Sequence, residues 1–246
     1  MARVLLINPN TSAGVTERLA PVLAAELGTG HVVVPVTARF GADYIASEAA
    51  YCIAAHATLD AFAASGKGAG GVLVGCFGDP GVWALRECFD GPVIGLAEAA
   101  MREAATHGSF AIVTGGARWR PMLERLAVAL GLGQALRHIE IVERTGAQLA
   151  ADPSAAQGLL TEACQVAERS GARSVILGGA ALVGMAATLQ PRLALPLIDN
   201  VEAGGRAMRA ALAHAAASSA AGPDGAHYTG LSAELSAWLA APPARA

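Results

Sequence analysis

The sequence has few aromatic residues and almost no lysine. Aromatic residues make up 4% of the 246 residues, against 54% hydrophobic residues and 29 glycines. Small apolar side chains favour close packing of helices on sheets, which is typical of an α/β protein. Lys67 is the single lysine and lies in a glycine-rich loop. Pyridoxal phosphate chemistry needs a positioned, desolvated lysine, so the sequence excludes it.

The chain also lacks a strong charge of either sign. Its formal net charge of -3 gives no sign of the positive surface that binds nucleic acid or an anionic membrane. No apolar run is long enough to span a bilayer, and the N-terminus has neither the length nor the cleavage site of a secretory signal. We therefore expect a cytoplasmic protein without nucleic-acid or membrane partners, and small-molecule chemistry follows by elimination.

Recognisable metal and nucleotide motifs are missing as well. The four cysteines are irregularly spaced, and the six histidines form no i, i+4 pair, so we predict no metal site and no disulfide framework. The run 66–71 matches G-x-G-x-x-G, but it precedes a predicted strand instead of following one. It is therefore a loop and not a dinucleotide site.

What the sequence does contain is a repeated βαβ pattern. Short β-branched runs alternate with alanine-rich segments of helical period, which predicts mainly parallel sheets whose ligand sites lie beyond the carboxyl ends of the strands. The predicted strands are 4–7, 32–36, 72–74, 93–94, 110–113, 139–142, 175–177 and 195–198.

The second half of the chain repeats landmarks of the first half, displaced by 103 to 106 residues. The clearest match between the halves is between Pro92-Val93-Ile94-Gly95-Leu96-Ala97-Glu98-Ala99 and Pro196-Leu197-Ile198-Asp199-Asn200-Val201-Glu202-Ala203. We predict two pseudo-symmetric α/β lobes, each with a mainly parallel four-stranded sheet, and an active site in the cleft between them. The first lobe is residues 1–97 joined by a helix near 203–216, and the second is 98–202. A tail, 217–246, carries a short helix within 231–239 and ends in a frayed stretch, 242–246.

Polar residues gather directly after the first predicted strand, in Asn8-Pro9-Asn10-Thr11-Ser12. Any one of them could be a helix N-cap and nothing more. Several together favour function, since a helix N-terminus at a strand end offers N–H groups to an anion and these side chains add donors.

Cys76 is the leading candidate for chemistry. Free cysteines are usually small buried hydrophobes, which suits Cys52, Cys88 and Cys164 within predicted helices. Cys76 instead ends a predicted strand, in Gly75-Cys76-Phe77-Gly78-Asp79-Pro80-Gly81, and we expect Asp79-Pro80 to start the next helix. A thiol at a helix N-terminus has a lowered pKa and serves as base or nucleophile. The repeat of this run, Ser174–Ala180, has Gly179 in place of the cysteine.

The chain resembles the aspartate/glutamate/hydantoin racemase superfamily and is most similar to its hydantoin and allantoin racemase branch. The motifs that carry the resemblance are the runs 7–12, 76–81, 92–99 and 196–199, and the match spans residues 3–215. The resemblance implies no cofactor, a homo-oligomer, and one cysteine from each lobe on either side of an acidic carbon. Cys76 matches the first catalytic cysteine, and Gly179 falls where the second belongs. Positions expected to line the substrate pocket are Asn8, Asn10, Thr11, Phe77, Gly78, Thr114, Gly115, Gly116, Gly179 and Ala180, with the N–H groups of Phe77 and Gly78 as an oxyanion site.

The missing second thiol leaves the reaction type open. No cysteine follows Cys164, and the conceivable substitutes for a second acid or base are Asp199, His107 and bound water, none of which the sequence singles out. The leading hypothesis is cysteine-based proton transfer next to the carbonyl of a carboxylate, amide or imide, as in a racemase. One alternative is a single-cysteine decarboxylase like the arylmalonate decarboxylases, although their cysteine lies in the second lobe. Two others are a hydrolase of cyclic amides with Cys76 as nucleophile and a ligand-binding protein without catalysis.

Overall fold

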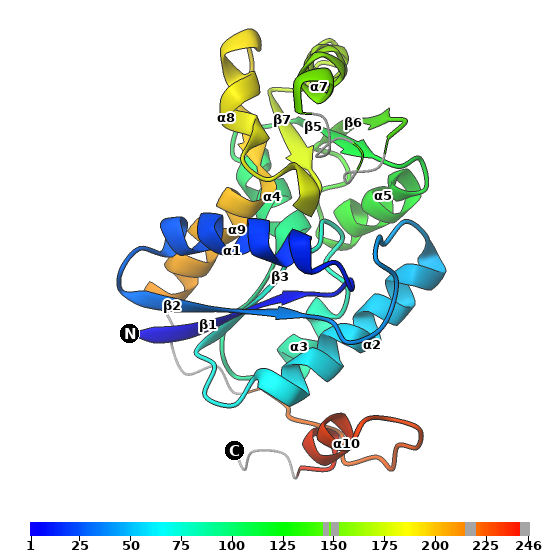
Figure 1. The fold of residues 1–246 in the computed structure, drawn as a ribbon. Helices are drawn as coiled ribbons and strands as arrows, with labels where there is room; N and C mark the ends of the chain where they lie inside the picture. Colours follow the sequence, from blue (N-terminus) through cyan, green and yellow to red (C-terminus); the bar gives the residue numbers. More distant parts are fainter. Residues whose placement is uncertain (145–147, 149–152, 215–219, 242–246) are drawn as a thin grey trace.

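The computed structural model describes residues 1–144, 148, 153–214 and 220–241, and it contains two parallel four-stranded sheets (Figure 1). The order of strands is the same in both, so the second sheet repeats the topology of the first. This confirms the predicted α/β class. The first sheet runs β2 (His31–Thr37), β1 (Ala2–Asn8), β3 (Gly71–Val74), β4 (Val93–Gly95), and the second runs β6 (Leu136–Val142), β5 (Phe110–Gly115), β7 (Ser174–Gly178), β8 (Leu197–Asp199).

Helices cover both faces of the first sheet. On one face α1 (Ala13–Leu27) packs with Leu19 and Leu23 inward, and α9 (Asn200–Ala213) packs beside it through Val201 and Met208. On the other face α2 (Glu48–Ser65) and α3 (Val82–Cys88) cover the sheet. Burial of these apolar stripes is the main stabilising term for each helix.

The second sheet is covered in the same way. Helices α4 (Leu96–Ala105) and α5 (Trp119–Ala129) pack on one face, while α7 (Pro153–Glu168) and α8 (Met185–Leu189) pack on the other. Two short 3₁₀ helices, η1 (Ala180–Leu182) and η2 (Gln190–Arg192), lie in the connections around α8.

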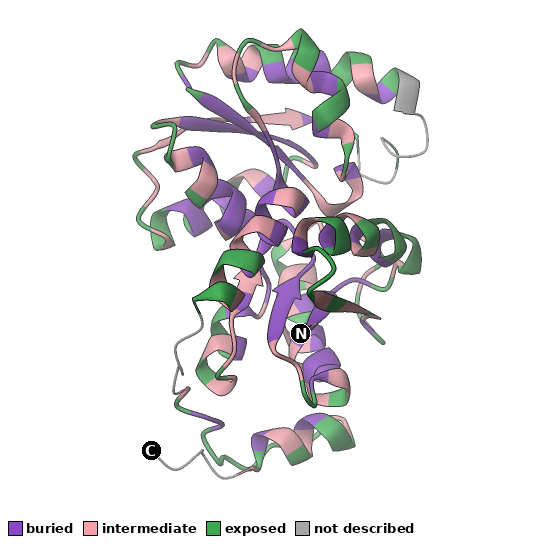
Figure 2. Ribbon diagram, turned by 90° about the vertical axis from the view of Figure 1, so that its left-hand side faces the viewer, coloured by how far each residue is buried: buried purple, intermediate pink, exposed green. Residues whose placement is uncertain are grey.

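The lobes exchange one helix each. Although α4 follows β4 of the first sheet, its Met101 and Ala104 lie in one cluster with Phe110 and Ile112 of the second sheet. Conversely, α9 follows β8 of the second sheet and packs against α1 of the first lobe. Figure 2 shows buried residues along the strands of both sheets and in the helices between them. The exchange fixes how the two lobes face each other.

The described part of the tail, residues 220–241, lies along the first lobe. Its helix α10 (Ala233–Leu239) packs on α2, with the rings of Trp238 and Phe62 5.0 Å apart between centroids. Ser232 donates a 2.6 Å hydrogen bond to the buried Asp60. Residues 242–246, predicted to be frayed, lie outside the described residues. Across the described ranges, no helix is both long and apolar enough to traverse a bilayer.

Two glycines allow the lobes to approach closely. The Phe77 ring of the first lobe lies where a Cβ on Gly178 would be, and the Trp119 indole of the second lobe lies where a Cβ on Gly78 would be. Each aromatic ring thus packs on bare backbone of the opposite lobe. Any side chain at either glycine would displace the ring above it.

Gly178→Ala should therefore destabilise the protein by about 1–3 kcal/mol, because the added methyl group overlaps the Phe77 ring. Gly158→Ala in α7 is the matched control, since nothing lies within 4 Å of its new Cβ. That change should instead add about 0.5–1 kcal/mol by improving helix propensity. Urea unfolding of both variants measures the difference, and equal effects would contradict the proposed packing.

Candidate active site

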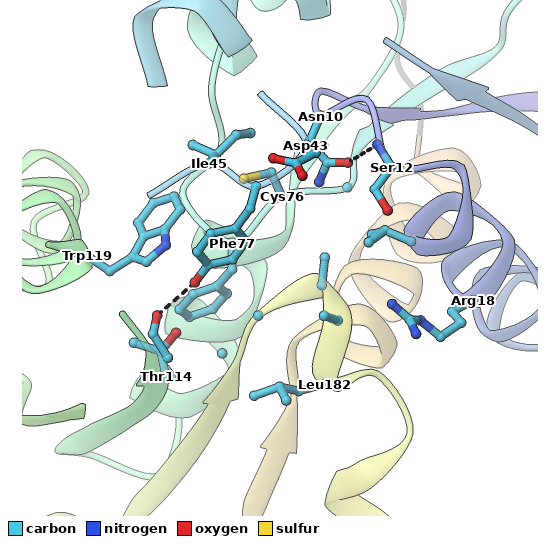
Figure 3. Close-up of a pocket in the computed structure, with 18 residues that line it drawn as sticks. Asn10, Ser12, Arg18, Asp43, Ile45, Cys76, Phe77, Thr114, Trp119 and Leu182 are labelled. Carbon is cyan, nitrogen blue, oxygen red and sulfur yellow. Dashed lines mark hydrogen bonds between the residues drawn. The ribbon is translucent and has the colours of Figure 1, made fainter. Parts of the chain in front are cut away.

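The carboxyl ends of the two sheets enclose a cavity of about 170 Å³ between the lobes (Figure 3). Its first-lobe wall comes from the loops after β1, β2 and β3 and from the start of α1. Its second-lobe wall comes from the strand ends of β5 and β7, from Trp119 and from η1. The lining residues are Asn10, Ser12, Val15, Arg18, Asp43, Tyr44, Ile45, Gly75, Cys76, Phe77, Thr114, Gly115, Trp119, Gly178, Gly179, Ala180, Ala181 and Leu182.

Cys76 follows the end of β3 and is 6% exposed, with its sulfur at the cavity (Figure 3). The backbone around it is a tight turn. The N–H groups of Gly78 and Asp79 donate to the Cys76 carbonyl at 2.9 and 3.1 Å. These bonds fix the backbone of Cys76 at the cavity wall.

The expected lowering of the Cys76 pKa is wrong. Burial raises the pKa of this thiol above its usual range, and the negative charge of Asp79 raises it further. The physical reason is local geometry: the N–H groups of Gly78 and Asp79 donate to the Cys76 carbonyl and not to its sulfur, and α3 begins only at Val82. At neutral pH the resting thiol is therefore protonated.

The sequence led us to expect that Asp79 starts the next helix, but in the structure it does not. Its backbone has a φ of 59°, and its carboxylate accepts from the N–H groups of Ala97 at 2.9 Å and Glu98 at 2.7 Å. It therefore caps the N-terminus of α4. Burial raises its pKa to about 7, although the two N–H donors act in the opposite direction.

Asn8 organises the loop after β1 from beneath. It is fully buried, and its Nδ2 donates to Asn10 Oδ1 at 2.9 Å and Thr16 Oγ1 at 2.9 Å. Asn10 Oδ1 also accepts from the Ser12 N–H at 2.9 Å. These bonds fix the orientation of the Asn10 amide. The described residues contribute no hydrogen bond to its Nδ2, which lies at the cavity as a donor (Figure 3).

The second-lobe wall has no thiol where the pseudo-symmetry would place one. Gly179 has a φ of +139°, a conformation that suits glycine, and a Cβ there would meet only Leu182 at 3.6 Å. Asn200 Nδ2 donates to the carbonyl of Leu177 at 2.8 Å and lies 3.4 Å from that of Gly179. The strand end is thus braced through its backbone and presents no side chain.

Two substitutes suggested by the sequence do not reach the cavity. The oxygens of Asp199 accept from the N–H groups of Val201 and Gly184 at 2.8 Å each, so this carboxylate is a structural cap of α9. His107 is exposed in the turn before β5, at the opposite end of the sheet from the cavity. Neither residue lines the site.

Most of the predicted pocket positions meet at this cavity. Those that line it are Asn10, Cys76, Phe77, Thr114, Gly115, Gly179 and Ala180. Four others do not: Asn8 is buried beneath the loop, Thr11 is exposed with its N–H bonded to Ala42, Gly78 is covered by Trp119, and Gly116 forms a turn with a φ of +89°. The predicted oxyanion role of the Gly78 N–H is also wrong, because this group donates to Cys76.

The sequence reasoning missed the loop between β2 and α2. Its residues Asp43, Tyr44 and Ile45 line the cavity, and the Tyr44 hydroxyl donates to the carbonyl of Gly115 at 3.2 Å. The available signal was position, since this loop follows the carboxyl end of a parallel strand just as the Cys76 loop does.

Comparison with known proteins agrees with this architecture. A sequence profile of the Asp/Glu/hydantoin racemase family matches residues 4–208. The chain belongs to this family. Hydantoin racemase of Paenarthrobacter aurescens is 32% identical over 205 residues, which cover 82% of this chain and 87% of that protein.

Solved structures give the same result for the fold. Allantoin racemase from Klebsiella pneumoniae superposes with a TM-score of 0.88 at 30% identity, covering 97% of this chain and 99% of that one. Arylmalonate decarboxylase superposes with a TM-score of 0.57 at 17% identity, covering 87% and 94%, and at that identity the likeness concerns the fold alone. The predicted family and enzyme class are confirmed.

The influence of Asp79 on the thiol can be measured directly. Asp79→Asn keeps an acceptor for the α4 N-terminus but removes the charge that raises the Cys76 pKa, so thiolate should form at lower pH. Ultraviolet absorbance of thiolate against pH, corrected with Cys76→Ala, reports the change. Asp199→Asn is the matched control because it removes a carboxylate cap in the second lobe. An equal shift in both variants would contradict the account.

Proposed function

We propose that this enzyme transfers a proton at a carbon next to the carbonyl of a carboxylate, amide or imide, with Cys76 as acid and base on one face. Racemisation is the reaction that family membership favours. The observation that carries the proposal is the burial of a protonated thiol at the strand end of β3, on the wall of a small cavity.

Deprotonation breaks the substrate C–H bond, forms the S–H bond, and moves the electron pair onto the carbonyl oxygen. The charge on that oxygen needs donors that are already in place. Asn10 Nδ2 supplies one, because its amide is oriented by Asn8 and Ser12. The Phe77 N–H supplies a second, since the bonds of the Cys76 turn use the neighbouring N–H groups and leave this one.

The remaining wall restricts the substrate. Gly179, Ala180 and Ala181 contribute backbone and methyl groups, while Ile45 and Trp119 add apolar surface. A cavity of about 170 Å³ suits a small carboxylate or a cyclic imide with a short substituent. The relatives named for hydantoin and allantoin substrates are consistent with that class.

Decarboxylation is the second candidate, favoured by one specific observation. The strand end at Gly179 carries no thiol, and a single thiol that rests protonated can deliver its proton to an enediolate after carbon dioxide leaves. Hydrolysis of a cyclic amide by the Cys76 thiolate is less well supported, because the raised pKa keeps that nucleophile scarce. A binding protein without catalysis is the remaining alternative.

The exchange of substrate hydrogen for deuterium in heavy water distinguishes these reactions. With D- and L-5-methylhydantoin, allantoin and phenylmalonate as probes, we expect deuterium in recovered hydantoin or allantoin. A decarboxylase would label only the product of the malonate, a hydrolase would label neither pool, and a binding protein would leave all probes unchanged. Cys76→Ala should slow the exchange at least ~100-fold, the usual contribution of a positioned acid or base. Cys52→Ser, which removes an exposed thiol outside the cavity, should have no effect.

The pH dependence follows from the raised pKa of Cys76. A thiol that must first ionise to act as a base gives a rate that rises about tenfold per pH unit below its pKa. The enzyme-dependent exchange rate, kcat/KM, should therefore still be rising at mildly alkaline pH. A profile that is flat from neutral pH upward would identify the thiol as the reactive acid and would support decarboxylation instead.

A further inference from the structure

We infer that the Tyr44 phenol is the acid and base on the second face of the substrate, in the role left open by Gly179. The inference rests on the proposed function, since it names the group that would complete proton transfer with inversion. Its starting point is that Tyr44 belongs to a first-lobe loop but places its hydroxyl on the second-lobe wall.

The position of the hydroxyl follows from the hydrogen bond and the sheet register. Tyr44 Oη lies 3.2 Å from the carbonyl oxygen of Gly115, at the end of β5. Strand β5 pairs with β7, with Thr114 opposite Gly178, so the ends of these strands are neighbours. Adjacent strands are about 4.8 Å apart. Gly115, which accepts the phenol's hydrogen bond, is therefore about one strand's width from the end of β7 that carries Gly179, at the same edge of the sheet.

Among the described residues that line the cavity, no other ionisable side chain fits this role. Besides Cys76 the ionisable residues are Arg18, Asp43 and Tyr44. A guanidinium does not deprotonate in proteins. The Asp43 carboxylate is exposed and lies beside Asn10 and Cys76 in Figure 3, on the first-lobe side of the cavity. Of the residues that the structure describes at the cavity, Tyr44 alone brings an ionisable group to the wall opposite the thiol.

The loop that carries Tyr44 is anchored at both ends. At its start, Arg39 binds the buried Asp60 carboxylate through two hydrogen bonds of 2.8 and 3.0 Å. In its middle, the Ala42 carbonyl accepts from the Thr11 N–H at 3.0 Å. At its end, Ser47 caps α2 through the N–H of Ala50. These contacts hold the phenol at a defined place on the wall.

The turn at Gly116 makes room for the hydroxyl. A Cβ at this glycine would lie 3.2 Å from Tyr44 Oη, and its φ of +89° is one that other residues rarely adopt. The second-lobe backbone is therefore shaped to receive the phenol closely.

The proton balance can be written for one direction. The resting site first releases the Cys76 proton to water. The thiolate then takes the α-proton from one face, and Tyr44 donates its O–H proton to the carbon from the other face, which leaves a phenolate. The phenolate finally takes a proton from water, which restores the resting thiol and phenol. No other reactant is consumed, and the opposite direction uses the same two groups in exchanged roles.

Tyr44→Phe tests the inference, with D- and L-5-methylhydantoin in heavy water as probes. The variant keeps the ring and loses only the hydroxyl. Conversion of one enantiomer into the other should fall at least ~100-fold, the range for loss of a general acid or base. The enantiomer whose C–H faces Cys76 should still incorporate deuterium with retention of configuration, at a rate within about threefold of that of the parent protein. That split is specific to a proton-transfer role, because a loss of lobe closure would slow both processes together.

Glu48→Gln is the matched control. It breaks another tie between the lobes, the Arg125–Glu48 ion pair at 2.6 Å, without touching the cavity. Conversion and incorporation should keep their ratio in this variant. The inference is overturned if Tyr44→Phe still converts enantiomers at the parent rate, if it loses both processes equally, or if the parent protein exchanges deuterium without converting enantiomers. A parent protein that exchanges neither enantiomer contradicts the proposed function itself.

Discussion

The bond between Asp79 and the N-terminus of α4 is the contact on which the site depends. Asp79 belongs to the turn that holds Cys76, whereas α4 packs on the second sheet. One buried carboxylate therefore ties the position of the thiol to the opposite lobe. Burial raises the pKa of the thiol, and the charge of the same carboxylate raises it further, so Asp79 influences both the position and the protonation state of the thiol. A structural cap thus tunes the reactive group.

Close approach of backbone and ring completes the closure around the cavity. Phe77 packs on Gly178 from one side, and Trp119 packs on Gly78 from the other. Both contacts need a glycine, because any Cβ would overlap the ring. The glycine-rich composition therefore serves the junction between the lobes, where small residues let two sheets present their strand ends to one small volume.

Much of the fold could be predicted because hydrophobic periodicity is local. The strand after Met1, the strand before Cys76 and their copies in the second half all show in short apolar runs. Hydrophobic periodicity alone does not predict the exchange of α4 and α9 between the lobes, because both helices have the pattern of ordinary amphipathic segments. Their partners are decided by packing far along the chain.

The site was predictable only where motif and strand end coincide, as at Asn10 and Cys76. Tyr44 escaped because a lone tyrosine in a loop carries no local signal, and its role arises from a contact 71 residues away in sequence. The thiol pKa was predicted in the wrong direction for a related reason: burial, and the use of nearby N–H groups within the turn, are tertiary properties.

The most direct test of the account is a crystal structure of the protein with 5-methylhydantoin bound. The account predicts the molecule in the cavity between the lobes, with the Cys76 sulfur within about 3.5 Å of the ring carbon that carries the methyl group. That carbon should have the thiol on one face only. A molecule bound elsewhere, or a thiol directed away from that carbon, would contradict the central claim.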